Sequence, residues 1–178
     1  MPDDHHPTRL ALLDAGIALA AELPLAKLSV DRIVQRAGVA KGTFYLHFAD
    51  RSAFAVALYQ RFLALVDDAL QQARQGLDPG LERLGTTITA YLDTCLNRHE
   101  ARALLFDPHS DPAVSDEVQK FEEQFTRWVA ADLRAASTDH ARETARLLAA
   151  ATSETARVEL GRGRRQPNMR AALLALAR

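Results

Sequence analysis

Residues 28–48 read LSVDRIVQRAGVAKGTFYLHF, and this stretch predicts two short helices joined by a tight turn. Ser29 is a favourable N-cap for the first helix, and Asp31 places a negative charge in the first turn, where it suits the helix dipole. Gly38 follows as the residue that best tolerates the left-handed backbone of a sharp helix end. An apolar face at helical spacing is made by Val30, Ile33, Val34 and Ala37.

A second helix is predicted to begin near Lys41, and packing does not account for one of its faces. Phe44 and Phe48 lie about one turn apart and are expected to hold this helix against the first. A helix start with free N–H groups, a lysine and a threonine hydroxyl suits a phosphate, so the pair of helices is typical of a helix-turn-helix that reads DNA. The residues left over on that face are Lys41, Gly42, Thr43, Tyr45 and His47.

The run from Ala37 to Phe48, followed by Arg51 and the apolar Phe54, resembles the signature of the TetR family of bacterial transcriptional regulators. The resemblance covers roughly residues 9–56, and beyond them the chain is similar to the family only in being helical and of suitable length. In that family the second helix of the motif enters the major groove of DNA.

The resemblance implies which residues contact DNA. Base contacts are implied at the start of the second helix, around Ala40, Lys41 and Thr43, with Gly42 among them. Arg9 is either a further phosphate contact or an ordinary surface arginine. Phosphate contacts are implied for Ser29, Lys41, Thr43, Tyr45, His47 and Arg51.

Three positions depart from the family's pattern. Ala40 stands where a serine is common, so the second helix of the motif lacks a side-chain cap. Arg51 stands where the family usually has lysine, which keeps the charge and changes the geometry of the donors. Pro24 stands near a usual glycine, which stiffens the connection between the first two helices.

Composition limits the classes of protein to which the chain can belong. Of its 178 residues, 48% are hydrophobic and 25% charged, as in an ordinary globular protein, and the formal net charge of −1 gives no global field for nucleic acid. No apolar run approaches the length of a bilayer span, and the acidic, histidine-bearing N-terminus is unlike a secretory signal. The single Cys95 excludes an internal disulfide, and we expect the protein to be cytoplasmic.

The whole sequence predicts an all-α fold of about nine helices, because no segment shows a strand pattern. We expect a three-helix DNA-binding head over residues 1–50 and a helical bundle for ligand binding and dimerisation over residues 51–178. The first helix is expected to be capped by Thr8 and to end near Glu22. Later helices are expected over about residues 51–75 (capped by Asp50), 81–97, 100–106, 114–136, 140–160 (capped by Thr138 or Asp139) and from Pro167 onward.

The last two helices carry apolar segments that are expected to be buried between two copies of the chain. Residues 147–151 read LLAAA and residues 171–176 read AALLAL. Burial across a two-fold axis makes a four-helix interface, which the resemblance also implies. A homodimer presents two recognition helices about 34–36 Å apart and predicts a palindromic operator in double-stranded DNA.

The resemblance also implies a small-molecule effector that enters the bundle and changes the spacing of the two heads. As a set, the candidate residues favour an apolar or aromatic effector, although each one alone is more typical of core packing. The sequence indicates no cofactor and no metal ligand set. The candidate lining consists of Phe62, Val66, Ile88, Leu92, Leu104, Phe106, Phe121, Phe125 and Trp128.

The function favoured by these patterns is a DNA-binding regulator, a repressor released from its operator by the effector. An activator of the same fold is the first alternative, and a small helical carrier or enzyme is the second. His109, Ser110 and Asp111 have the residue types of a hydrolytic triad, but neighbours in one loop rarely meet its geometry. Cys95 is a redox sensor or a buried thiol, and the basic residues 161–165 contact nucleic acid or form a solvated, flexible turn.

Overall fold

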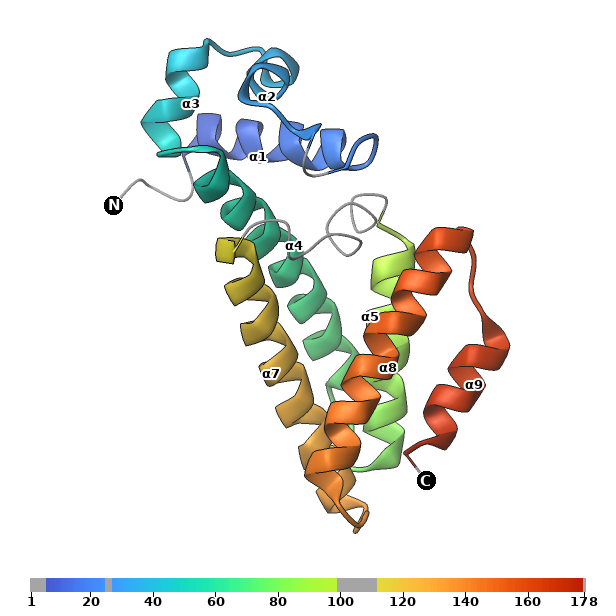
Figure 1. The fold of residues 1–178 in the computed structure, drawn as a ribbon. Helices are drawn as coiled ribbons and strands as arrows, with labels where there is room; N and C mark the ends of the chain where they lie inside the picture. Colours follow the sequence, from blue (N-terminus) through green and yellow to red (C-terminus); the bar gives the residue numbers. More distant parts are fainter. Residues whose placement is uncertain (1–5, 25–26, 99–111, 178) are drawn as a thin grey trace. The chain divides into compact units, whose positions relative to one another are not determined.

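The structure is a computed structural model that describes residues 6–24, 27–98 and 112–177 of the chain. Within these ranges it contains helices and no strand, which confirms the predicted all-α fold (Figure 1). The short helix expected over residues 100–106 lies outside the described residues. The helices are α1 (Pro7–Ala20), α2 (Val30–Ala37), α3 (Lys41–His47), α4 (Arg51–Arg74), α5 (Leu81–Leu96), α7 (Pro112–Ala135), α8 (Ala141–Arg162) and α9 (Pro167–Ala175).

The chain forms two compact units. The first consists of Met1–Phe62 and His99–Val118, and the second of Leu63–Arg98 and Gln119–Arg178. Helices α4 and α7 each contribute residues to both units. The division by function between residues 50 and 51 stays a prediction.

The first unit is held together by an aromatic cluster beneath α3. The rings of Phe44 and Phe48 lie 5.4 Å apart, and both approach Phe54 of α4, at 5.4 Å and 5.0 Å between centroids. Leu12 of α1 and Ile33 of α2 are fully buried in the same unit. Phe44 and Phe48 are buried as predicted, so the spacing of these two residues fixes which face of α3 turns inward.

Local capping chemistry sets most of the helix ends in this unit. The Oγ of Ser29 accepts the N–H of Arg32 at 3.4 Å, and the Oδ1 of Asp50 accepts the N–H of Ala53 at 2.8 Å. Gly38 ends α2 in the left-handed region, with φ 69° and ψ 30°. These three residues confirm the caps and the turn that the sequence predicts.

Two predicted caps are wrong. The cap of α1 is His6, whose Nδ1 accepts the N–H of Thr8 at 3.2 Å, because Pro7 occupies the first helical position and moves the cap upstream of Thr8. The helix ends at Ala20, before the predicted Glu22. Neither Thr138 nor Asp139 caps α8: its N-cap is His140, in the left-handed region with φ 52° and with no side-chain cap bond.

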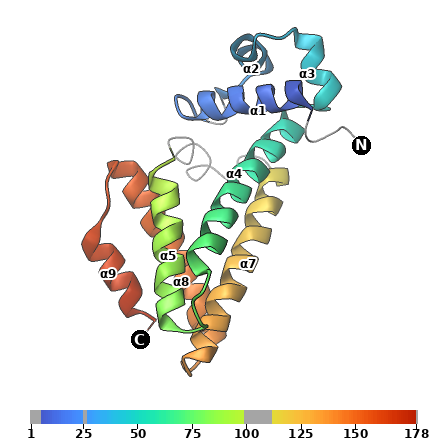
Figure 2. The same cartoon turned by 180° about the vertical axis from the view of Figure 1, so that it is seen from behind.

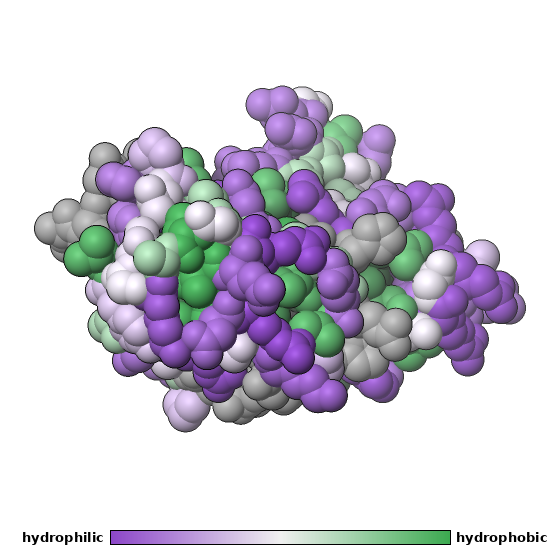
Figure 3. All heavy atoms as spheres, turned by 90° about the horizontal axis from the view of Figure 1, so that it is seen from above, coloured by the Kyte–Doolittle hydropathy of each residue, from purple (hydrophilic) through white to green (hydrophobic). Residues whose placement is uncertain are grey.

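The second unit contains α5, α8 and α9 together with parts of α4 and α7. Helix α5 packs along α8, and α9 packs against α8 (Figures 1 and 2). The interior of this unit is apolar. Figure 3 shows the whole chain from above the view of Figure 1, and hydrophilic side chains dominate that face, with apolar patches between them. Fully buried residues of the interior include Leu70, Leu84, Ile88, Leu92, Val129, Leu133, Ala145 and Leu148.

A buried carboxylate joins three helices inside the second unit. The side chain of Asp132 on α7 is 0% exposed and pairs with Arg74 of α4 at 3.2 Å and with Arg83 of α5 at 2.6 Å. Arg74 also donates to the Oγ1 of Thr87 at 2.9 Å. Removing either arginine leaves a buried negative charge short of a partner, so this cluster fixes the pairing of α4, α5 and α7.

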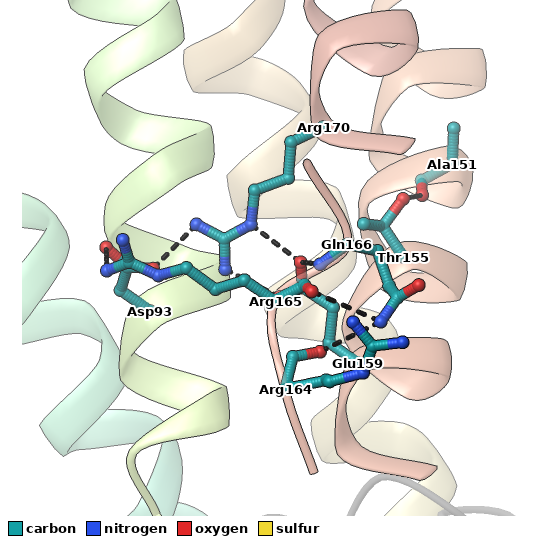
Figure 4. A network of polar contacts seen from close by, with 8 residues as sticks. All are labelled: Asp93, Ala151, Thr155, Glu159, Arg164, Arg165, Gln166 and Arg170. Carbon is teal, nitrogen blue, oxygen red and sulfur yellow. Dashed lines mark hydrogen bonds and ion pairs between the residues drawn. The ribbon is translucent and has the colours of Figure 1, made fainter. Parts of the chain in front are cut away.

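A second buried carboxylate fixes the junction between α8 and α9. Glu159 is fully buried and accepts the backbone N–H of Gln166 at 2.7 Å and the guanidinium of Arg170 at 2.5 and 2.7 Å (Figure 4). Asp93 of α5 accepts from Arg170 at 2.6 Å and from Arg165 at 2.8 Å. The interactions tie α9 and the segment before it to α8 and α5.

All five residues of the basic segment 161–165 are exposed, as predicted for a solvated turn, but its first two residues are helical. Gly161 and Arg162 belong to α8, and Gly163 is its C-cap, in the left-handed region with φ 64°. Arg165 pairs with Asp93, and Arg162 donates to Gln166 at 2.6 Å. The helix continues through Gly161 because the buried Glu159 network holds its last turn in place.

Replacing Gly16 by alanine should destabilise the first unit. An added Cβ would lie 2.6 Å from Cζ of Phe54 and 3.2 Å from Cδ1 of Leu58, and the ring of Phe54 is itself packed against two other rings. We expect a loss of about 1–3 kcal/mol by overpacking, against a gain of about 1 kcal/mol in helix propensity. Thermal unfolding measures the net loss.

Gly85 provides the matched control for this substitution. A Cβ added there comes no closer than 3.8 Å, to Cδ2 of Leu174, and the residue lies within α5. Gly85→Ala should therefore leave the melting temperature unchanged or raise it. Equal stabilisation by both substitutions would contradict the close packing of α1 on α4.

Candidate nucleic-acid interface

Helices α2 and α3 form a helix-turn-helix in the first unit (Figure 1). The turn is closed by the N–H of Gly38 on the carbonyl of Gln35 at 3.3 Å and the N–H of Val39 on the carbonyl of Val34 at 3.1 Å. The two helices are thus held at a fixed angle by backbone hydrogen bonds and by the buried aromatic cluster below. The first helix of the pair is amphipathic, with Ile33 and Val34 buried.

Helix α3 has one buried face and one exposed face. Phe44 is buried, whereas Lys41, Tyr45 and Leu46 are exposed, Tyr45 by 51% and Leu46 by 79%. The ring of Tyr45 meets Phe44 edge-on at 5.4 Å, which orients the phenol while leaving its hydroxyl end outside the core. The exposed face is available to a partner that approaches α3 from solvent.

Lys41 is paired within the free protein. Its Nζ lies 2.8 Å from Oδ1 of Asp31 on α2, and this hydrogen bond raises the pKa of the Lys41 ammonium. Both side chains are more than half exposed, so the pair contributes little to stability. Its effect is positional: it holds the positive charge beside the first turns of α2 and α3.

His47 lies at the end of α3 against the N-terminal cap of α1. Its ring centroid is 4.7 Å from that of His6, and burial, with smaller contributions from His6 and Arg9, lowers the pKa of His47. The guanidinium of Arg9 lies 5.0 Å from the centre of the Phe48 ring. Arg9 therefore contacts the aromatic cluster, and its role as a phosphate contact stays a prediction.

The other predicted DNA contacts lie in the same unit and reach the surface to different degrees. Ser29, Ala40, Gly42 and Arg51 are exposed, whereas Thr43 is half-buried. Ala40 is the N-cap of α3 and makes no side-chain cap bond, as predicted. A Cβ added to Gly42 would meet no atom within 4 Å, so the folded chain itself does not require glycine at this position.

Three residues of this surface were not identified from the sequence. Leu46 is exposed because it lies opposite the Phe44–Phe48 stripe, a position that the helical spacing already indicates. Asp31 was interpreted only as a favourable charge for the helix dipole, and its pairing with Lys41 depends on the turn geometry. His6 contacts His47 across the fold, for which the sequence carries no local signal.

Residues 12–58 match the family model described as bacterial regulatory proteins of the tetR family. This stretch of the chain is similar to the N-terminal domain of TetR-family regulators. The matched residues contain the whole of α2 and α3 and the exposed face just described, so the predicted TetR resemblance is confirmed. The helix-turn-helix of this domain is a DNA-binding motif.

Solved structures share the fold over nearly the whole chain. A TetR-like transcriptional regulator from Rhodococcus sp. RHA1 is 21% identical, with 99% of this chain and 96% of that chain covered and a TM-score of 0.81. The fatty acid degradation regulator FadR from Bacillus halodurans is 16% identical. The match covers 98% of this chain and 95% of that chain, with a TM-score of 0.78. FadR from Bacillus subtilis, solved in complex with stearoyl-CoA, is 15% identical. The match covers 94% of this chain and 96% of that chain, with a TM-score of 0.78.

The predicted effector residues divide by their burial. Leu104 and Phe106 lie outside the described residues. Phe121 stacks on Tyr91 at 6.2 Å and Phe125 lies 5.5 Å from the same ring, so these two predicted residues form one cluster with Tyr91. Phe62, Val66, Ile88, Leu92 and Phe125 are buried, and Phe121 and Trp128 are partly exposed.

Trp128, one of the predicted effector residues, contacts a charged side chain. The guanidinium of Arg74 lies 5.2 Å from the centre of the Trp128 ring and also contacts the buried Asp132. Burial lowers the pKa of Arg74, although the neighbouring Asp132 opposes this shift. Sequence spacing did not identify Arg74 or Asp132, because their pairing joins positions 58 residues apart.

Cys95, the 109–111 segment, metal ligation and membrane spans are the remaining features that the sequence raised. Cys95 is buried, and burial raises the pKa of its thiol to about 12, so the thiolate is scarce at neutral pH and the interpretation as a buried thiol is confirmed. The His109–Ser110–Asp111 segment lies outside the described residues. Over residues 6–24, 27–98 and 112–177, no three or more His, Cys, Asp or Glu side chains gather as a metal site, and no helix is long and apolar enough to cross a membrane.

Proposed function

We propose that the protein is a cytoplasmic, homodimeric transcriptional regulator that represses from a palindromic operator and is released by a small, largely apolar effector. The observation that carries the proposal is the exposed polar face of α3 in a TetR-family helix-turn-helix. Packing needs only the Phe44 side of this helix. The outer side is therefore the surface that enters the major groove.

Each proposed DNA contact has a distinct physical role. Lys41 and Arg51 supply positive charge to phosphates, and Ser29, Thr43, Tyr45 and His47 supply hydrogen-bond donors. Ala40, Lys41 and Thr43, with Gly42 between them, are the residues of the α3 start that approach the base edges. The Lys41–Asp31 ion pair opens when the ammonium turns to a phosphate, which costs little because the pair is exposed.

The dimer is proposed to form through α8 and α9. Leu147 is 69% exposed and Leu176 is 58% exposed, while the neighbouring Leu148 is fully buried within its own unit. Ala150 on α8 and Ala171 on α9 are also exposed. Apolar residues exposed on both helices support burial against a second copy.

The effector is proposed to be largely apolar and to contact the aromatic and aliphatic residues of the bundle, Leu104 and Phe106 among them. The cluster of Tyr91, Phe121 and Phe125 supports this chemistry. The structural likeness to a FadR solved with stearoyl-CoA gives further support, since that ligand carries a long alkyl chain. A coupling of about 1–3 kcal/mol between effector and DNA would change operator occupancy about 5- to 150-fold.

Binding to DNA from the region upstream of the protein's own gene tests the function. We expect Lys41→Ala and Tyr45→Ala to weaken operator binding while circular dichroism and melting temperature stay unchanged. If Lys41 and Arg51 alone neutralise phosphates, a dimer makes about four such contacts, and the log–log salt slope should be about −3 to −4. Gel shift or fluorescence anisotropy at several salt concentrations measures both quantities.

Arg36→Ala is the matched control, because Arg36 lies on α2, pairs with Glu22 at 3.1 Å and is not among the proposed contacts. It should bind the operator like the unaltered protein. A salt slope near zero, or loss of helicity in the Lys41 and Tyr45 variants, contradicts the assigned contacts. Substrate turnover without any DNA shift would favour the enzyme alternative.

Gly42→Ala should separate stability from DNA binding. The added methyl group meets open space in the free protein and improves helix propensity, so we expect the unfolding free energy to rise by about 0.5–1 kcal/mol. The same methyl group stands where the start of α3 approaches DNA and should weaken operator binding. Thermal unfolding and anisotropy on one preparation measure the two effects, and unchanged or tighter DNA binding would contradict the proposed contact.

Leu147→Glu should dissociate the proposed dimer. A charge at this exposed position does not disturb the interior of its unit, but it cannot be buried in an apolar interface without a partner. We expect sedimentation velocity to show monomers and operator affinity to fall with them. Leu81→Glu, at a position 43% exposed on α5, is the control and should stay dimeric.

A further inference from the structure

A groove of about 770 Å³ lies between α7 and α8 within the second unit. The two helices are consecutive and are joined at the lower end of the molecule in Figure 1. Small residues that line the groove are Ala130, Ala149, Ala150 and Ser153. Its charged lining consists of Glu122, Glu123, Arg127 and Arg134 from α7 and Arg142 and Arg146 from α8.

The four arginines of the groove are exposed, and within the part of the chain that the structure describes they form no hydrogen bond or ion pair. Other arginines of the second unit are paired: Arg74 and Arg83 with Asp132, and Arg170 with Glu159. The groove therefore concentrates guanidinium groups that the fold itself does not use.

The two arginines of α8 are placed unfavourably in the free protein. Arg142 and Arg146 are four residues apart on α8, a spacing at which like charges repel on a helix surface. Arg142 is also the second residue of α8, where the helix dipole disfavours a cation. Arg127 and Arg134 lie two turns apart on the facing helix. A bound anion would turn this repulsion into attraction.

The two ends of the groove differ in charge. Arg134 and Arg142 lie next to the connection between the helices, whereas Glu122 and Glu123 lie three turns away on α7. At 1.5 Å per residue, the distance along α7 from Glu122 to Arg134 is about 18 Å. An entirely anionic ligand fills only the arginine end, so the whole groove suits a ligand with phosphates at one end and N–H donors at the other.

We propose that the α7–α8 groove binds a nucleoside di- or triphosphate, with its phosphates on the four arginines and the amino group of its base near Glu122 and Glu123. Guanidinium groups bind phosphate oxygens in bidentate pairs, and carboxylates accept from exocyclic amines. The groove volume lies within the range of about 300–1,000 Å³ typical of small-molecule sites.

The groove is separate from the proposed DNA contacts and adjoins the proposed dimer face, because Ala149 and Ala150 line the groove and also belong to the apolar segment 147–151. Arg146 and Leu147 are neighbours in sequence and therefore point about 100° apart around α8, the one into the groove and the other onto the proposed dimer face. None of the proposed DNA contacts lies in the second unit. Nucleotide binding to the purified protein can therefore succeed or fail independently of operator binding.

Isothermal titration calorimetry with ATP, inorganic tripolyphosphate and adenosine tests the site in the intact chain at low salt. We expect ATP to bind more tightly than tripolyphosphate and adenosine not to bind. Arg142→Ala/Arg146→Ala should weaken ATP binding about tenfold or more, which corresponds to at least about 1.4 kcal/mol. Glu122→Gln/Glu123→Gln should weaken ATP binding and leave that of tripolyphosphate unchanged or tighter.

Arg164→Ala is the matched control, since Arg164 is an exposed arginine of the same unit that does not line the groove. Arg127→Ala/Arg134→Ala is a second variant on the other wall. The melting temperature of Arg142→Ala/Arg146→Ala should stay level or rise because the repulsion between these two arginines is removed. ATP binding that neither double variant weakens, or that Arg164→Ala weakens equally, overturns the proposal. So does tripolyphosphate binding as tight as that of ATP, or binding of a single-stranded oligonucleotide in the absence of ATP binding.

Discussion

The packing of Phe44 against Phe48 and Phe54 is the contact on which the first unit depends. Three rings within 5.4 Å of one another join α3 to the start of α4. They bury the apolar side of α3. The opposite face then has no packing role, which is why Tyr45 and Leu46 remain exposed. A short helix of seven residues is marginal alone, so this anchor is also what makes α3 a rigid reading element.

In the second unit, buried ion pairs fix how the helices pack, as the aromatic cluster does in the first unit. Asp132 and Glu159 are each fully buried, and each finds its partners on other helices or beyond the end of its own. Such clusters are poor sources of net stability, because desolvation offsets most of the attraction. They restrict the ways in which α4, α5, α7, α8 and α9 can pair, since any other pairing leaves a carboxylate without its guanidinium.

Local chemistry made the head predictable. Ser29 and Gly38 act on neighbours three or four residues away, and Phe48 is the C-cap of α3, four residues after Phe44, so the sequence alone identifies them. His6 displaced Thr8 as a cap because Pro7 shifted the helix start by one position. The course of α8 past Gly161 could not be predicted, because it depends on partners of Glu159 in the next helix.

The same distinction between local and distant pairing explains the arginines of the α7–α8 groove. A run of basic residues in the sequence attracts attention, yet the arginines before α9 are largely engaged: Arg165 pairs with Asp93 and Arg162 with Gln166. Arg127 and Arg146 are distant in the sequence and line the same groove because α7 and α8 both border it. Charge density in the sequence is therefore a weaker guide to anion binding than the absence of internal partners, and that criterion selects the groove over the basic run.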